Sequence, residues 1–134
     1  MNGSKITRAV GVCALLFLPA CGGGTTTTTP TPVASTQTFS GTLQPGGSAS
    51  FNFTVNVEST ATLGITALAP QSTVTMGIGV GQFATTCTLF SSVENAKAGS
   101  TYPVDLTPGA YCVEIYDLGN LTGPNTYTLT VTHT

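Results

Sequence analysis

The sequence predicts an all-β fold, a single antiparallel β-sandwich of about eight strands. Short runs of alternating apolar and polar residues recur from residue 37 onward, as expected of strands with one buried face. Turn-forming Gly, Pro and Asn separate these runs. Only 6% of the 134 residues are charged, and Thr and Ser supply much of the polarity in the runs. Because β-branched Thr favours strands, this composition also favours a sheet protein.

The predicted strands follow one another with turn signals between them. They cover residues 38–43, 49–57, 61–69, 73–81, 85–91, 101–106, 108–117 and 126–132. The second has the cleanest alternation, with Phe51, Phe53, Val55 and Val57 on one face. In the fourth, Gly77, Gly79 and Gly81 occupy one face, which indicates close approach of another group or a bulged strand.

The strand at 108–117 is the clearest element of the chain. It opens on Pro-Gly, and Tyr111, Val113 and Ile115 then alternate with Cys112, Glu114 and Tyr116. We expect the first three side chains to point into the sandwich and the last three to point outward.

The first twenty residues predict an export signal. Lys5 and Arg8 make a positive start, and residues 9–18 form a short apolar run. That run is too short for a permanent transmembrane helix but suits the apolar core of a signal peptide. Residues 1–20 are therefore assigned to the signal peptide.

The signal ends in Leu18-Pro19-Ala20-Cys21. This segment resembles the lipobox of bacterial lipoproteins, which implies cleavage between Ala20 and Cys21 and acylation of Cys21. Two or three acyl chains hold a protein stably on a membrane, whereas one holds it marginally. The alternatives are an ordinary export signal with an incidental cysteine, or a retained hydrophobic tail. Gly22 rather than Asp at the next position favours the outer membrane or cell surface over the inner membrane.

Residues 21–36 are expected to be a lipidated cysteine followed by a linker of Gly, Thr and Pro. The linker has too little apolar content to order itself. Residues 37–134 form the sandwich domain. Beyond residue 8 the cations reduce to Lys97, against five acidic residues. Without a basic patch, nucleic-acid binding is not expected.

Two cysteines remain for the domain, Cys87 and Cys112. Disulfides persist in exported proteins, so these residues predict a structural bridge worth roughly 3 kcal/mol. A zinc site would need two further ligands, and the sequence has a single His, His133, expected at a frayed terminus. A redox pair would favour cysteines close together in sequence.

The order of motifs resembles the bacterial pre-peptidase C-terminal domain. The motifs are Leu-x-Pro-Gly at 43–46, Phe-x-Phe-Thr-Val at 51–55, Leu-x-Ile at 63–65, Leu-x-Pro-Gly-x-Tyr-x-Val-x-Ile at 106–115 and Tyr-x-Leu-x-Val at 127–131. The resemblance implies a jelly-roll-like sandwich of the kind appended to secreted enzymes. The chain lacks that family's acidic run before the middle strand and any catalytic partner, so no calcium or collagen role is carried over.

Candidate ligand contacts are few. Glu114 and Tyr116 should face outward, where Glu114 is expected to be a solvated carboxylate and Tyr116 could stack on a sugar. Asp117 opens the turn-rich segment 117–125 and should order that loop by bonding backbone N–H groups. Its alternative role is to bind calcium together with loop oxygens. No arrangement of residues predicts catalysis, a cofactor or a metal site.

The sequence therefore predicts a lipid-anchored, non-catalytic envelope protein. Its sandwich would serve structural, adhesive or protein-binding roles, with the membrane as one partner through Cys21 and envelope proteins or glycans as others. The alternative is an accessory module that binds a glycan or calcium. Few lysines guard the predicted strands, so edge-to-edge assembly is a further hypothesis.

Overall fold

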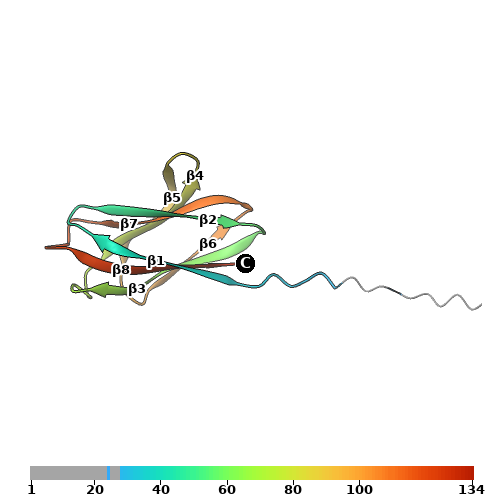
Figure 1. Ribbon diagram of the computed structural model, residues 1–134, viewed down its shortest axis with the longest axis horizontal. Helices are drawn as coiled ribbons and strands as arrows, with labels where there is room; N and C mark the ends of the chain where they lie inside the picture. The colour runs from blue at the N-terminus through green and yellow to red at the C-terminus, as the bar shows by residue number, and fades with distance from the viewer. Residues whose placement is uncertain (1–23, 25–27) are drawn as a thin grey trace, which may run out of the picture. The chain divides into compact units, whose positions relative to one another are not determined.

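The structure, a computed structural model, describes residue 24 and residues 28–134. These residues form eight strands and no helix (Figure 1). The strands are β1 (Ser35–Leu43), β2 (Ser48–Val55), β3 (Ser59–Ala69), β4 (Met76–Phe83), β5 (Cys87–Ala96), β6 (Thr101–Leu106), β7 (Gly109–Asp117) and β8 (Asn125–His133). Nothing in this part of the chain is a helix of the length and apolar character needed to cross a bilayer.

The strands make two antiparallel sheets of four that face each other, seen as two layers in Figure 1. The first sheet has the order β1-β8-β3-β6, and the second has the order β2-β7-β4-β5. Successive strands alternate between the sheets, except that β4 and β5 form a hairpin within the second sheet. This order is that of a jelly roll. The predicted all-β, jelly-roll-like sandwich is confirmed.

The core lies between the sheets and is made by the alternation that the sequence shows. In β7, Tyr111, Val113 and Ile115 point inward and are buried, as predicted. In β8 the residues from Asn125 to His133 alternate between buried and partly exposed positions. Each fully buried aliphatic side chain contributes about 1.5–3 kcal/mol of apolar burial.

β1 begins earlier than predicted, at Ser35 rather than at residue 38. The cause is its partner: β8 runs to His133, which pairs with Ser35. The Thr36 hydroxyl also lies 2.8 Å from that of Thr132. The last two residues of the predicted linker, Ser35 and Thr36, therefore belong to the first sheet.

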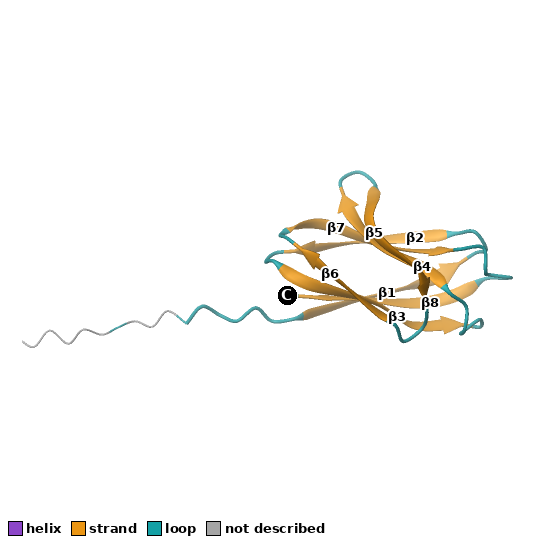
Figure 2. Ribbon diagram, turned by 180° about the vertical axis from the view of Figure 1, so that it is seen from behind, coloured by secondary structure: helices purple, strands orange, loops and turns teal. Residues whose placement is uncertain are grey.

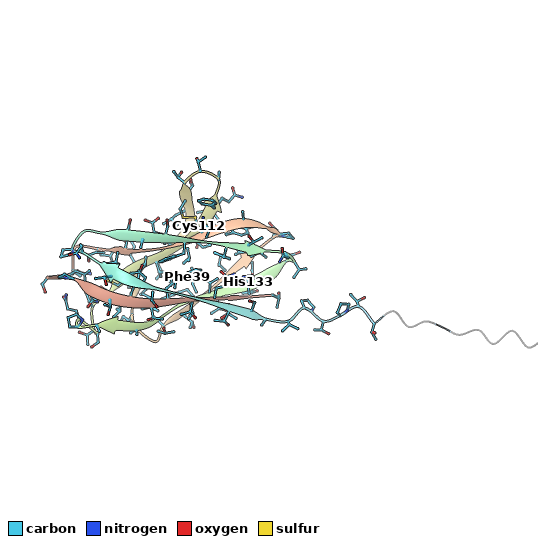
Figure 3. The ribbon with its side chains drawn as sticks, in the orientation of Figure 1. Phe39, Cys112 and His133 are labelled. Carbon is cyan, nitrogen blue, oxygen red and sulfur yellow. A yellow bond between two sulfur atoms is a disulfide. The ribbon has the colours of Figure 1, made fainter. Side chains whose placement is uncertain are left out.

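His133 is not frayed, which corrects a second expectation. Its side chain is 6% exposed, and its ring centroid lies 5.6 Å from that of Phe53. Figure 3 shows it between the two layers. Pairing with β1 holds the end of β8 in the sheet. The position of His133 in the sequence alone could not reveal that pairing.

β2 ends at Val55, two residues earlier than predicted. Val55 pairs with Gly109, the first residue of β7, so the ladder has no partner beyond that point. Val57 consequently leaves the inward face and is 41% exposed.

β4 begins at Met76, later than predicted, and β5 continues to Ala96 instead of ending at residue 91. The residues before Met76 form a loop, while the polar segment 92–96 pairs with the start of β4. Two register shifts interrupt this hairpin, one between Met76 and Ile78 and one between Val80 and Gly81. The extra residue at each shift lies in β5, while β4 keeps an unbroken register with β7. The bulge expected in β4 is therefore found in its neighbour, and the glycines of β4 are explained by the other expectation, close approach of neighbouring groups.

Candidate interaction surfaces

The predicted lipid-attachment segment lies outside the described residues. Ala20 and Cys21, together with the signal peptide at 1–20, belong to the part of the chain that the structure does not describe. Cleavage and acylation therefore stay predictions.

The predicted disulfide between Cys87 and Cys112 is present, with an S–S distance of 2.02 Å and a Cα–Cα distance of 5.7 Å. It joins β5 to β7, although β4 lies between these strands in the sheet. Gly81 of β4 pairs with Cys112. A Cβ on Gly81 would lie 2.2 Å from the Thr88 carbonyl oxygen, so only glycine fits there.

The bridge fastens the β4–β5 hairpin against the outer side of the second sheet. This hairpin projects beyond the two layers in both Figure 1 and Figure 2, and Figure 3 shows Cys112 at its base. Cys112 is fully buried even though it points away from the core. The hairpin, rather than the sandwich interior, covers it.

Glu114 and Tyr116 point outward from β7, as predicted. Glu114 lies between Ser50 and Gly79 on the neighbouring strands and is partly exposed. The Tyr116 ring lies over Gly77, where an added Cβ would come within 2.1 Å of it. Tyr116 therefore explains why residue 77, the first of the three glycines on one face of the predicted strand, has no side chain.

Asp117 orders the loops at its end of β7. Its carboxylate accepts hydrogen bonds from the backbone N–H groups of Gly46 at 2.8 Å, Asn120 at 2.9 Å and Leu121 at 3.1 Å. Burial acts to raise its pKa, but the backbone hydrogen bonds together outweigh this and hold the pKa below its ordinary value. The loop-ordering role that the sequence favoured is what the geometry provides, while the calcium alternative stays a prediction.

A second set of hydrogen bonds ties the loop after β3 to the loop before β8. The Asn125 side chain is buried, and its Oδ1 accepts a bond from the Gln71 N–H at 2.8 Å. The Gln71 side chain in turn bonds Thr122 and the Gly123 carbonyl. Asn120 Nδ2 donates to Thr75. These loops, residues 70–75 and 118–124, are called the loop cluster below, together with the β1–β2 turn at residues 44–47.

The loop cluster lies at the end of the sandwich opposite to the point where the chain enters. The chain enters at Ser35, which pairs with His133 at the end of β8. The cluster instead joins the opposite ends of the same strands, where Leu43 pairs with Asn125. The sequence indicated turns here but not their mutual bonds, because Gln71 and Asn125 are 54 residues apart.

The two lateral sides of the sandwich differ. On the closed side, where β1 faces β2, the Phe39 and Phe51 rings stack with centroids 4.7 Å apart. On the open side, where β5 faces β6, a cavity of about 40 Å³ remains between the edges. The sequence did not single out this side. Glu114, Tyr116 and Asp117 do not line the cavity.

Charged and metal-ligating groups are scattered over the described residues. Within residue 24 and residues 28–134 no three His, Cys, Asp or Glu side chains converge to hold a metal ion. Asp105 accepts a hydrogen bond from the Thr60 hydroxyl at 2.6 Å on the outer face of the first sheet.

Comparison with known proteins identifies the fold only. No family model matches the chain, and no curated protein sequence matches it. The resemblance to pre-peptidase C-terminal domains therefore stays a prediction. A solved structure is similar: PliG of Aeromonas hydrophila, a periplasmic lysozyme inhibitor of g-type lysozyme. The TM-score is 0.55 at 13% identity, over 75% of this chain and 88% of PliG.

Proposed function

We propose that the chain is an exported protein, anchored to the membrane through acylated Cys21, whose sandwich binds a protein partner without catalysing a reaction. The loop cluster carries this proposal, because it is the end of the sandwich opposite to Ser35, where β1 begins. An outer-membrane or cell-surface location fits the Gly at position 22. The disulfide fits an oxidising compartment outside the cytoplasm.

The loop cluster has the physical properties of a binding surface. Loops held on a rigid sandwich commonly carry recognition residues. Here Asp117, Gln71 and Asn125 already fix the loops, so binding would lose little conformational entropy. Its exposed residues are uncharged, among them Gln44, Pro45, Asn120 and Pro124. Such a surface suits a partner that offers hydrogen-bonding and apolar groups rather than a strong charge.

The similarity to PliG supports a role in protein binding. PliG is an inhibitor of g-type lysozyme, so a sandwich of this fold can act on another protein in the periplasm. A lysozyme is therefore the first partner to test. Binding of a glycan or of calcium is the competing function, and the same experiment separates it.

Mass spectrometry of the mature protein tests the anchor. We expect an N-terminal Cys21 carrying acyl chains, and a Cys21→Ser chain that no longer partitions with membranes. A mature protein that begins at another residue, or that lacks lipid, would contradict the anchor.

Capture from cell envelopes tests the binding role. The full chain should retain a defined protein, g-type lysozyme included among the candidates, and the double variant Gln44→Arg/Pro124→Arg should lose it. Asn52→Arg on the exposed outer side of β2 is the matched control and should retain it. Retention by all three chains, or capture of glycan alone, would overturn the proposal.

A further inference from the structure

Phe90 is an exposed aromatic side chain at the open side. It is 54% exposed and lies on β5, the edge strand of the second sheet on the open side. The register shift between Val80 and Gly81 leaves it without a pairing residue, since Ser91 and Leu89 take the adjacent partners on β4. A bulge of this kind at a sheet edge redirects a side chain out of the regular ladder.

The Phe90 ring lies on the inner side of the second sheet. Its centroid is 6.2 Å from that of Tyr111, an inward side chain, in an edge-to-face arrangement. Tyr111 is fixed in turn by stacking on Phe53 at 5.8 Å and by donating a hydrogen bond to the Thr107 carbonyl at 2.9 Å. The exposed Phe90 ring therefore packs against a tyrosine whose position is fixed.

The cavity of the open side begins directly after Phe90 in the chain. Ser91, Ser92 and Val93 of β5 line it on one side, and Tyr102, Pro103 and Val104 of β6 line it on the other. Its volume of about 40 Å³ exceeds the roughly 10–15 Å³ that a cavity needs to hold one water molecule. The cavity is thus a small hollow at the edge of the sandwich, lined by both edge strands.

An exposed ring and a hollow on the same side make the surface self-complementary. Under two-fold symmetry each copy would give its ring and receive that of its partner, so the contact closes at two copies. The segments 82–93 and 102–104 contain no charged residue. A contact confined to these two segments includes no charged side chain, while the exposed Glu94 and Asp105 follow them directly in sequence.

Strand pairing across the free edges is disfavoured. Pro103 of β6 has no N–H group to offer a further strand, and two bulges interrupt the pairing of β5. Both features are known to disfavour edge pairing. Side chains rather than a continuous backbone ladder must then make the contact. We propose that the open side binds a second copy of this chain, with Phe90 of each copy packing its ring edge into the cavity between β5 and β6 of the other. This inference does not depend on the lipid anchor or on the loop cluster.

Photo-crosslinking in membranes tests the proposal on the full chain. A photoreactive p-benzoylphenylalanine at position 102 should produce a covalent dimer whose crosslinked peptide contains Phe90. Adding Phe90→Ala should lower the yield about tenfold, as expected for the loss of an aromatic anchor. Val57→Ala, which changes the other exposed large apolar side chain within residues 35–134, should leave the yield unchanged. The Cys21→Ser chain, purified at high concentration, should give the same dimer.

Three results would overturn the proposal. The first is a monomer under both conditions, with the Cys87–Cys112 bridge intact as the check of folding. The second is a dimer that persists in Phe90→Ala but disappears in Ser92→Pro, which would indicate strand pairing. The third is a crosslink from position 102 to a different protein, which would assign the open side to another partner.

Discussion

The edge strands on the closed and open sides of the sandwich are held in place differently. On the closed side Phe39 and Phe51 stack between β1 and β2. The centroid of the Phe51 ring also lies 6.3 Å from that of Tyr127. On the open side a disulfide outside the core fastens β5, while Phe90 stays exposed beside a cavity. The closed side is held by burial within one chain. On the open side the covalent bond fastens β5 within its own sheet, and apolar surface stays exposed at Phe90.

The disulfide should have the largest effect on stability. Replacing Cys87 and Cys112 with Ala should lower the free energy of unfolding by roughly 3 kcal/mol, because the bridge restricts a loop of 25 residues in the unfolded chain. Urea denaturation measures the loss. Hydrogen exchange should show that β5 amides lose more protection than β1 amides. Equal loss on both sides would show that the bridge does not act preferentially on the open side.

The aromatic residues of the two sides should respond unequally. Phe39→Ala should cost about 2 kcal/mol, because it removes a partly buried stacking ring from the closed side. Phe90→Ala should change stability by no more than about 0.5 kcal/mol, as for most exposed positions. Urea denaturation of both variants at low protein concentration makes the comparison. Similar losses would mean that Phe90 supports the fold itself.

Sequence reasoning could predict what depends on local pattern. The alternation at Tyr111, Val113 and Ile115 predicts their burial, and the two cysteines left in a domain expected to be exported predict the Cys87–Cys112 bridge. Alternation cannot say which strands become edges or where a ladder shifts register. The exposure of Phe90 depends on both, since it follows from a bulge on an edge strand.

The remaining errors have the same origin. Val57 continues the alternation of β2, but its partner strand ends at Gly109. His133 is terminal in sequence, but β1 pairs with it. The sequence makes no prediction for the bond between Gln71 and Asn125, because this bond requires two loops to meet, which only the strand order decides. Each error concerns a contact between segments distant in sequence.

Asp117 should make the closed side sensitive to acid. Its carboxylate holds Gly46 in the β1–β2 turn, and Asp117→Asn should cost about 1 kcal/mol near neutral pH by weakening these bonds. Because its folded pKa lies below the ordinary value of 3.8, its contribution is complete above about pH 4. The contribution is lost as the pH falls through the folded pKa.

Denaturation between pH 2 and pH 7 measures this effect. The wild-type protein should lose stability on acidification more steeply than Asp117→Asn, and the two should converge at the lowest pH. Glu114→Gln, on the same strand, is the control for a general effect of removing a carboxylate. Parallel curves for wild type and Asp117→Asn would exclude the loop-ordering bonds as the cause.

Tyr127 should give the smallest effect, at alkaline pH. Burial raises its pKa above the ordinary value of 10.0. Its contribution to stability is therefore complete below pH 10 and is lost as the pH rises through the folded pKa. Tyr127→Phe should change stability by less than about 0.5 kcal/mol at pH 7, yet it should reduce the loss seen above pH 10. Because Tyr102, Tyr111 and Tyr116 remain in both proteins, the difference between the two curves isolates Tyr127. If the ring supports the closed side through Phe51, alkaline pH should expose β1 amides to exchange before β5 amides, and Tyr127→Phe should remove that order.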